Sequence, residues 1–312
     1  MSDNDSKPRR GIKVRELGIN NCFAAKRWPE PAAWAAITAK TFKLRSVQFS
    51  LDLMDPRADR AVQGAMCEEI RQALSAEGLR LHSTFTGLAA YAQNLLTHPQ
   101  LGCRLDALDW WDRAIQLSAR LGAQVTGGHF GAMSTADFQD SRRREYLLDF
   151  LIEALVQLSF RARQEGIQCL LWEPMPILRE APATIRDAVQ LHERANKRAA
   201  VPIQFCLDLG HQCAVGASGE DRDPYAWLRQ IGTLCPCIHL QQTDGKGDRH
   251  WPFTAECNRQ GIIRPAEVLE ALDKSGARDT SLMFEIIHAF EADESQVIAD
   301  IAESAAYWQS HI

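Results

Sequence analysis

The feature that most constrains the fold of this chain is a repeated alternation of short apolar segments with longer amphipathic stretches. The apolar segments are rich in leucine, β-branched and aromatic residues, as expected of strands that are buried on both faces. The stretches between them place apolar residues three and four positions apart, which is the period of a helix. Residues 106–122 and 145–166 are clear examples, and each ends in glycine, a frequent helix terminator. The predicted strands cover residues 15–22, 46–54, 79–85, 123–130, 167–174, 201–210, 236–244 and 280–288.

Eight predicted strands that alternate with helices over 312 residues are typical of a (β/α)₈ or TIM barrel, in the α/β class. A doubly wound open sheet is the rival fold, but the GxGxxG sequence that would follow its first strand is absent. No linker rich in glycine, serine or proline divides the chain. We therefore predict a single catalytic barrel domain over residues 13–312, preceded by a mobile polar tail over residues 1–12.

Composition and charge limit the kinds of partner that are expected. The formal net charge of −5 gives no basic footprint for nucleic acid. No apolar run reaches the roughly 18 residues that a membrane span needs, and the first residues are polar without an apolar signal segment. The nine cysteines form no CxxC pair, which favours free core thiols in a reducing compartment. We expect a cytoplasmic protein without a membrane partner.

Ionisable side chains gather at the predicted strand ends, where barrel enzymes place their active sites. Glu173, Asp208, His239 and Glu285 come from four successive strands, so the barrel brings them to one rim. Three carboxylates on one rim would repel each other strongly, and a divalent cation resolves that repulsion. The residue types suit one Mn²⁺, Mg²⁺ or Co²⁺ ion, with Zn²⁺ as a further option. The other polar residues at or beyond strand ends are His82, His129, His211, Asp248 and His250.

These residues resemble the pattern of the xylose isomerase-like barrel superfamily, which contains sugar isomerases, sugar epimerases and endonuclease IV. The sugar 3-epimerases of that group bind one divalent metal through Glu, Asp, His and Glu on strands five to eight. Those positions match Glu173, Asp208, His239 and Glu285, and the resemblance implies that His211 contacts the substrate. The segments HSTFTGLAAY, LLWEPMP, CLDLGHQC, IHLQQTDG and FEIIHAFEAD are similar to the tetrulose-phosphate epimerases of erythritol breakdown. Those enzymes interconvert D- and L-erythrulose 1-phosphate at C3.

The resemblance implies epimerisation of a sugar phosphate at C3 through a metal-bound cis-enediolate, with Glu173 and Glu285 as the two bases. It also implies contacts from the protein to the hydroxyls and phosphate of the small substrate. The candidates for these contacts are His211, His82, His129, His250, Lys246 and Arg179, with Arg249 as a further cation. Barrels of this group commonly pair, so a homodimer is expected.

Two alternatives remain open at this point. The order of ligand types also matches endonuclease IV, a trinuclear zinc phosphodiesterase that acts on abasic DNA, with Asp248 and His250 as extra metal ligands. Against DNA, the apolar and hydroxyl-rich stretch after His82 suits a small closed pocket, and DGKGDRHW offsets three basic residues with two aspartates. An aldose–ketose isomerase, which moves a proton between C1 and C2, would use the same metal chemistry.

Overall fold

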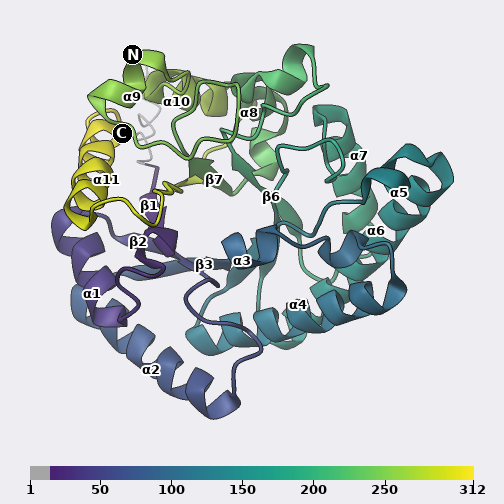
Figure 1. Cartoon of the computed structure of the whole chain (residues 1–312), viewed down its shortest axis with the longest axis horizontal. Helices are drawn as coiled ribbons and strands as arrows, with labels where there is room; N and C mark the ends of the chain where they lie inside the picture. Colours follow the sequence, from purple (N-terminus) through teal and green to yellow (C-terminus); the bar gives the residue numbers. More distant parts are fainter. Residues whose placement is uncertain (1–14) are drawn as a thin grey trace, which may run out of the picture.

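The computed structural model describes residues 15–312, which form a closed barrel of parallel strands in the order β1 to β8. Figure 1 looks along the barrel, with the helices arranged around it. Pairing of β1 with β8 closes the ring, so the predicted (β/α)₈ barrel is confirmed. The strands are β1 (Leu17–Asn20), β2 (Ser46–Ser50), β3 (Arg80–Phe85), β4 (Val125–Gly128), β5 (Cys169–Trp172), β6 (Ile203–Asp208), β7 (Cys237–Leu240) and β8 (Ser281–Phe284).

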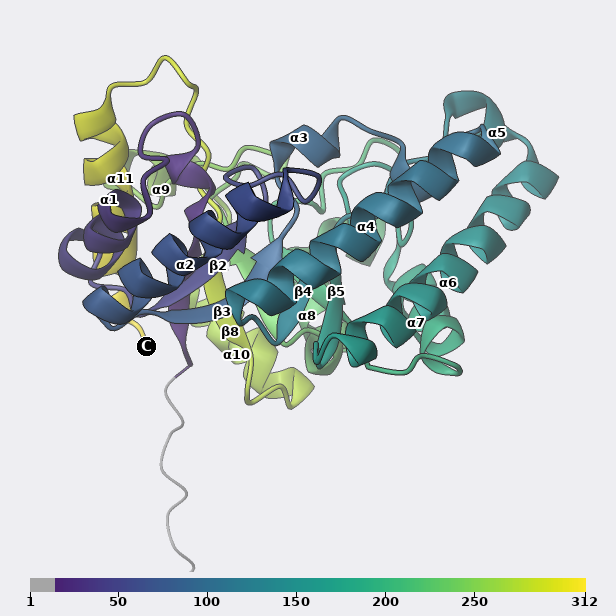
Figure 2. The same cartoon turned by 90° about the horizontal axis from the view of Figure 1, so that it is seen from below.

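Helices cover the outside of the barrel, and shorter ones lie within the loops. The short helix α3 directly follows the loop after β3 and lies at one end of the barrel (Figure 2). The helices are α1 (Pro31–Ala36), α2 (Arg60–Glu77), α3 (Leu88–Tyr91), α4 (Leu101–Leu121), α5 (Thr135–Gln139), α6 (Ser141–Gln164), α7 (Ile185–Asn196), α8 (Pro224–Ile231), α9 (Ala255–Gln260), α10 (Pro265–Ser275) and α11 (Glu294–Gln309).

Local sequence explains where the two longest helices begin and end. Gly122 follows α4 with a φ of 87°, the left-handed conformation that glycine adopts without strain. The side chain of Asp140 accepts hydrogen bonds from the first backbone N–H groups of α6, a standard N-cap. Both helices begin earlier than the periodic stretches in the sequence, because most residues of their first turns are exposed and follow no apolar period.

The interior of the barrel is filled by a compact apolar layer, so the barrel is not a pore. This layer consists of Phe85, Leu171, Cys206, Cys237 and Met283. Each of them is at most 1% exposed, and the layer lies beneath the polar side chains at the strand ends. All nine cysteines of the chain are free, as expected, but only Cys67, Cys206, Cys235 and Cys237 are buried in the core.

The strands are shorter than the predicted segments at one or both ends, and in every strand except β3 the last predicted residues belong to the loop that follows. Those loop residues include several of the candidate site residues. The predicted tail, residues 1–12, lies outside the described residues. Among residues 15–312, no helix combines the length and the apolar character that crossing a membrane requires.

Candidate functional site

Four predicted metal ligands meet at the carboxyl ends of β5 to β8. One ligand atom each from Glu173, Asp208, His239 and Glu285 lies within 4.8 Å of the others. His239 Nδ1 lies 3.1 Å from Glu173 Oε1, 3.0 Å from Glu285 Oε2 and 4.0 Å from Asp208 Oδ2. All four side chains are buried. The barrel therefore assembles three carboxylates around one imidazole nitrogen.

The environment of His239 determines which ring nitrogen faces the carboxylates. His239 Nε2 lies 2.6 Å from Gln48 Oε1, an oxygen that also accepts a hydrogen bond from Asn20 Nδ2. Gln48 Nε2 in turn donates to Ser83 Oγ, which fixes the orientation of the amide. Nε2 of His239 must then carry a proton and donate it to Gln48. Nδ1 is left as the nitrogen that a metal ion would meet.

Asp208 provides a direct test of whether these residues fit a cation. Its Oδ1 accepts hydrogen bonds from the backbone N–H of Gly210 at 2.6 Å and from Gln241 Nε2 at 2.9 Å. Among the described residues, Oδ2 has no hydrogen-bond partner, although the side chain is 0% exposed. A buried carboxylate oxygen without a partner is costly. A divalent metal ion coordinated by Asp208, Glu173, His239 and Glu285 satisfies it, so the donor set fits.

The charges at this centre shift the acidities of its two glutamates in opposite directions. Burial raises the pKa of Glu173, although His239 beside it works the other way. Burial also acts to raise the pKa of Glu285, but the charge and hydrogen bond of His239 outweigh it and hold that pKa at about 2. The pKa of His239 is well above its usual value, because the carboxylates outweigh the effect of burial. Glu173 and Glu285 therefore differ in acidity because their surroundings differ.

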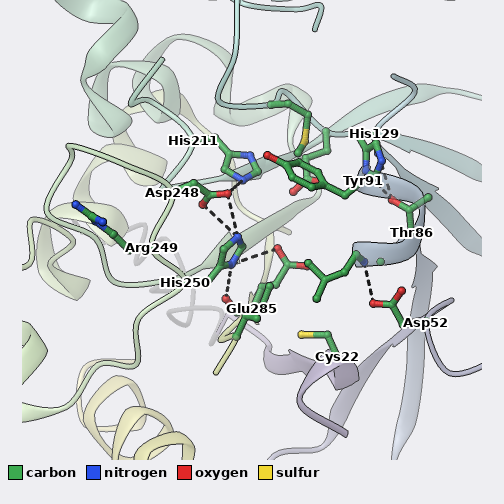
Figure 3. Close-up of a pocket in the computed structure, with 15 residues that line it drawn as sticks. Cys22, Asp52, Thr86, Tyr91, His129, His211, Asp248, Arg249, His250 and Glu285 are labelled. Atoms are coloured by element: carbon green, nitrogen blue, oxygen red, sulfur yellow. Dashed lines mark hydrogen bonds and ion pairs between the residues drawn. The ribbon is translucent and has the colours of Figure 1, made fainter. Parts of the chain in front are cut away.

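A second polar cluster lies beside the first and comes from the loops after β6 and β7. It contains His211, Asp248 and His250, whose side chains point toward one another in Figure 3. His250 Nε2 lies 3.1 Å from Asp248 Oδ1, and His211 Nε2 lies 3.4 Å from Asp248 Oδ2. Burial opposes the charged forms of both histidines. The carboxylates outweigh it and hold the pKa of His211 well above normal and that of His250 at about 9.

Both clusters border a cavity of about 270 Å³ at the end of the barrel. That volume is near the lower end of ordinary small-molecule pockets, which begin at about 300 Å³. The wall opposite His250 is formed by Thr86, Tyr91 and His129 (Figure 3). The remaining residues that line the cavity are Cys22, Asp52, Gly87, Leu88, Glu173, Met175, His211, Asp248, Arg249, Glu285 and Ile287.

The wall that contains Tyr91 is anchored through the loop after β2. Asp52 accepts hydrogen bonds from the backbone N–H groups of Leu88 at 2.8 Å and Ala89 at 3.0 Å, which fixes the start of α3. A Cβ atom at Gly87 would lie 2.1 Å from Asp52 Oδ2, so only glycine permits this approach. The ring of Tyr91 then packs edge-on against His129, with 5.6 Å between ring centroids.

The family of the chain follows from comparison with known proteins. A family model described as xylose isomerase-like TIM barrel matches residues 38–310. The chain belongs to this family. The D-erythrulose 1-phosphate 3-epimerase of Brucella abortus strain 2308 is 30% identical to the chain over 299 residues, which cover 95% of the chain and 96% of that enzyme. The resemblance identified from the sequence is therefore confirmed.

Solved structures support the xylose isomerase-like fold. A Rhodospirillum rubrum protein whose crystal structure was assigned as a xylose isomerase has a TM-score of 0.90 and 30% identity, covering 96% of this chain and 100% of its own. The D-psicose 3-epimerase of Clostridium cellulolyticum H10, solved with D-tagatose, has a TM-score of 0.68 and 15% identity, covering 95% of this chain and 99% of its own. At that identity the likeness concerns the fold alone.

Three residues predicted to contact substrate lie elsewhere in this xylose isomerase-like barrel. His82 is the third residue of β3 instead of its end, and its Nδ1 lies 2.9 Å from Ser83 Oγ. Arg179 donates to the backbone carbonyl of Met133 and faces a separate cleft. Lys246 is exposed in the loop after β7 and does not line the cavity. Their positions do not support the predicted contacts.

The position of His82 within β3 argues against the nuclease alternative, because the three-metal site of that alternative would require His82 to face the cavity. Burial lowers the pKa of His82 to about 4, as expected of an uncharged residue inside the barrel wall. His129, in contrast, does line the cavity. Arg249 is the one arginine or lysine among the described residues that line it, and its guanidinium is paired with Asp244.

Several residues of the site carry no charge and were missed by reasoning from charged groups. Asn20, Gln48 and Gln241 are buried amides that hydrogen bond to the predicted metal ligands. Asn20 donates to Glu285 Oε1 at 3.1 Å. A signal was present in the sequence, since each amide interrupts an apolar strand or directly follows one. A buried amide at such a position needs polar partners.

Proposed function

We propose that this chain is a divalent-metal-dependent sugar-phosphate epimerase that inverts C3 of a tetrulose phosphate such as erythrulose 1-phosphate. The observation that carries the proposal is the convergence of Glu173, Asp208, His239 and Glu285 beside a small cavity. The named activity of the Brucella abortus relative supports the choice of substrate.

The metal would be held by His239 Nδ1 and one oxygen each from Glu173, Asp208 and Glu285. When bound, it supplies Lewis-acid polarisation of the substrate carbonyl. Glu173 and Glu285 both line the cavity, and they come from strands β5 and β8 on either side of His239. One carboxylate removes the proton from C3, which the neighbouring carbonyl acidifies. The other returns a proton to the opposite face, and this inverts the carbon.

His211 is placed to hold a substrate oxygen. Its Nδ1 lies 2.9 Å from the carbonyl oxygen of Pro174 and donates to it, because that oxygen can only accept. Its Nε2 lies 3.4 Å from Asp248 Oδ2, within ion-pair distance, but makes no well-formed hydrogen bond among the described residues. That nitrogen therefore keeps its hydrogen-bonding capacity for the substrate, where it stabilises negative charge as C3 loses its proton.

The size and charge of the cavity agree with a short phosphorylated sugar. A volume of about 270 Å³ suits a small ligand. Arg249 is the nearest strong cation for a phosphate group. Its guanidinium makes two hydrogen bonds of 3.1 Å to Asp244 and packs over Trp251. Binding of phosphate by Arg249 would exchange one anionic partner for another.

Solvent exchange tests the proposal directly. The protein is incubated in D₂O with Mn²⁺ and erythrulose 1-phosphate, and the label is located by NMR. We expect deuterium at C3 with the wild type, and its loss in Glu285→Gln without loss of fold. Glu180→Gln is the matched control, because Glu180 is also a buried glutamate but does not line the cavity. Undiminished exchange in Glu285→Gln would remove Glu285 as a base, and deuterium at C1 instead of C3 would indicate an aldose–ketose isomerase.

The proposal extends to the setting of the enzyme. Within it, the protein acts in erythritol breakdown in the cytoplasm, where nine free cysteines remain reduced, and it works as a homodimer. Analytical ultracentrifugation at micromolar concentration measures the assembly. A sedimentation coefficient of a single 34.9 kDa chain would contradict the dimer.

A further inference from the structure

The buried amide of Gln241 links the two polar clusters of the site. Gln241 directly follows β7, two residues after His239, and is 0% exposed. Its Nε2 donates to Asp208 Oδ1 at 2.9 Å and to Asp248 Oδ1 at 2.7 Å. Its Oε1 accepts from the backbone N–H groups of Arg249 at 3.2 Å and His250 at 2.5 Å. One side chain therefore contacts a predicted metal ligand and three successive residues of the loop after β7.

These four hydrogen bonds use the full capacity of the amide, which has two N–H donors and two acceptor lone pairs. They also fix its orientation. If the amide were turned over, its oxygen would face two carboxylates and its NH₂ group would face two backbone N–H groups, so all four contacts would become repulsive. A neighbouring glycine makes room for the side chain, since a Cβ atom at Gly210 would lie 2.2 Å from Gln241 Cδ.

The orientation of Gln241 determines which oxygen of Asp208 faces the metal position. Two donors, Gln241 Nε2 and the Gly210 N–H, occupy Asp208 Oδ1. Oδ2 is then directed toward His239 Nδ1 and His211 Nε2, each at 4.0 Å. The same amide holds the backbone of His250, whose φ of 49° is an uncommon conformation for a residue with a side chain.

We propose that Gln241 is a positioning residue, which orients Asp208 toward the metal and holds Asp248 and His250 in place beside it. The inference rests on the proposed metal-dependent function. An amide suits the task because it donates to two carboxylates without neutralising them. Loss of an outer hydrogen-bond partner of a metal ligand typically weakens metal binding about tenfold to a hundredfold.

The next residue provides a matched control. Gln242 is also 0% exposed, and its side chain also uses both ends of the amide. It points away from the site, however, donating to Asn258 Oδ1 at 2.7 Å and to the carbonyl oxygen of Ile263 at 3.1 Å. Its Oε1 accepts from the backbone N–H of Ile263 at 3.0 Å. Gln242→Ala therefore removes the same kind of buried amide without touching a predicted ligand.

The experiment is titration calorimetry of Mn²⁺ into metal-free wild type, Gln241→Ala and Gln242→Ala, with the melting temperature of each metal-free protein measured alongside. We expect both variants to be destabilised, while the Kd for Mn²⁺ rises about tenfold to a hundredfold only in Gln241→Ala. Amide exchange of the metal-free proteins gives a second measurement. The N–H groups of Arg249 and His250 should exchange faster in Gln241→Ala, and that of Ile263 in Gln242→Ala. Gln241→Met, which keeps the length of the side chain, replaces the alanine variant if that does not fold.

The outcomes separate the inference from the proposed function. Wild type that binds Mn²⁺, with Gln241 variants that bind it equally well, would overturn the positioning role and leave the metal site intact. An equal loss of affinity in the Gln241 and Gln242 variants would also overturn it, because general destabilisation would then explain the effect. Wild type that binds no Mn²⁺, Mg²⁺ or Co²⁺ would overturn the proposed function, and this inference with it.

Discussion

The substitution Asp208→Asn tests whether Asp208 is a metal ligand or only stabilises the fold. Asparagine keeps the shape of the side chain, and its oxygen can still accept hydrogen bonds from Gly210 and Gln241. In the metal-free protein, burial raises the pKa of Asp208, with the charges of Asp248 and Glu285 adding to it and those of His211 and His250 opposing it. The ionised carboxylate is therefore a cost to the metal-free fold. We expect metal-free Asp208→Asn to be at least as stable as the wild type.

The effect should reverse when metal is added. A metal present at 100 times its Kd stabilises the native state by about 2.7 kcal/mol. With an unfolding entropy of about 2.1 cal/mol/K per residue, a chain of 312 residues gains about 4 °C in Tm from this energy. If Asp208→Asn loses at least a hundredfold in affinity, the same metal concentration contributes only about 0.4 kcal/mol, which is less than about 1 °C.

Differential scanning calorimetry with chelator and with increasing Mn²⁺ measures both effects, and elemental analysis gives the metal bound per chain. Asp137→Asn is the control, because it removes the charge of a partly exposed ion pair outside the site, in which Arg143 Nε lies 2.8 Å from Asp137 Oδ1. It should lower Tm by a similar amount with and without metal. An Mn²⁺-dependent rise in Asp208→Asn equal to that of the wild type would refute Asp208 as a ligand.

Three further predictions concern residues around this centre. Burial raises the pKa of Glu180 from 4.5 to about 7, so its stabilising contribution is present below pH 4.5 and is lost as pH rises through 7. Chemical denaturation should therefore show Glu180→Gln gaining about 3 kcal/mol over the wild type at pH 8 and little at pH 4. Arg249→Gln should raise KM about tenfold to a hundredfold for a phosphorylated ketose and hardly at all for the free sugar, as expected for loss of a charged hydrogen bond. In steady-state assays His129→Gln should raise KM, whereas His82→Gln should leave kcat/KM within about twofold, because only His129 lines the cavity.

The fold could be predicted from the sequence because its main signals are local. Alternating apolar segments and helical periods determine the order of elements, and a parallel barrel then places all strand ends on one rim. That rule is sufficient to bring Glu173, Asp208, His239 and Glu285 together, since each lies in its strand or directly after it. The catalytic and ligand roles of these residues remain predictions.

The misplaced residues depended on features that periodicity does not contain. The pairing of β2 with β3 shifts register between Val47 and Gln48, so that Leu81 and Ser83 are paired and His82 is passed over. The predicted segment, residues 79–85, already reaches the observed end of β3 at Phe85, so His82 lies three residues before the strand end and not at it. The loops that contain Arg179 and Lys246 make contacts distant in sequence, from Arg179 to the carbonyl of Met133 and from Arg222 to the carbonyl of Gly245, which no local pattern reports.

The buried amides of the site follow from the same electrostatics that call for a metal. A set of carboxylates attracts a divalent cation only while its negative charge is not already neutralised by the protein. A lysine or arginine in place of Gln241 would pair with Asp208 and compete with the ion, whereas an amide donates hydrogen bonds and leaves the charge intact. Gln48 also brings no charge to the site, and by accepting from Nε2 of His239 it leaves Nδ1 facing the carboxylates. Neutral side chains at the ends of barrel strands are therefore as informative about a metal site as the charged residues beside them.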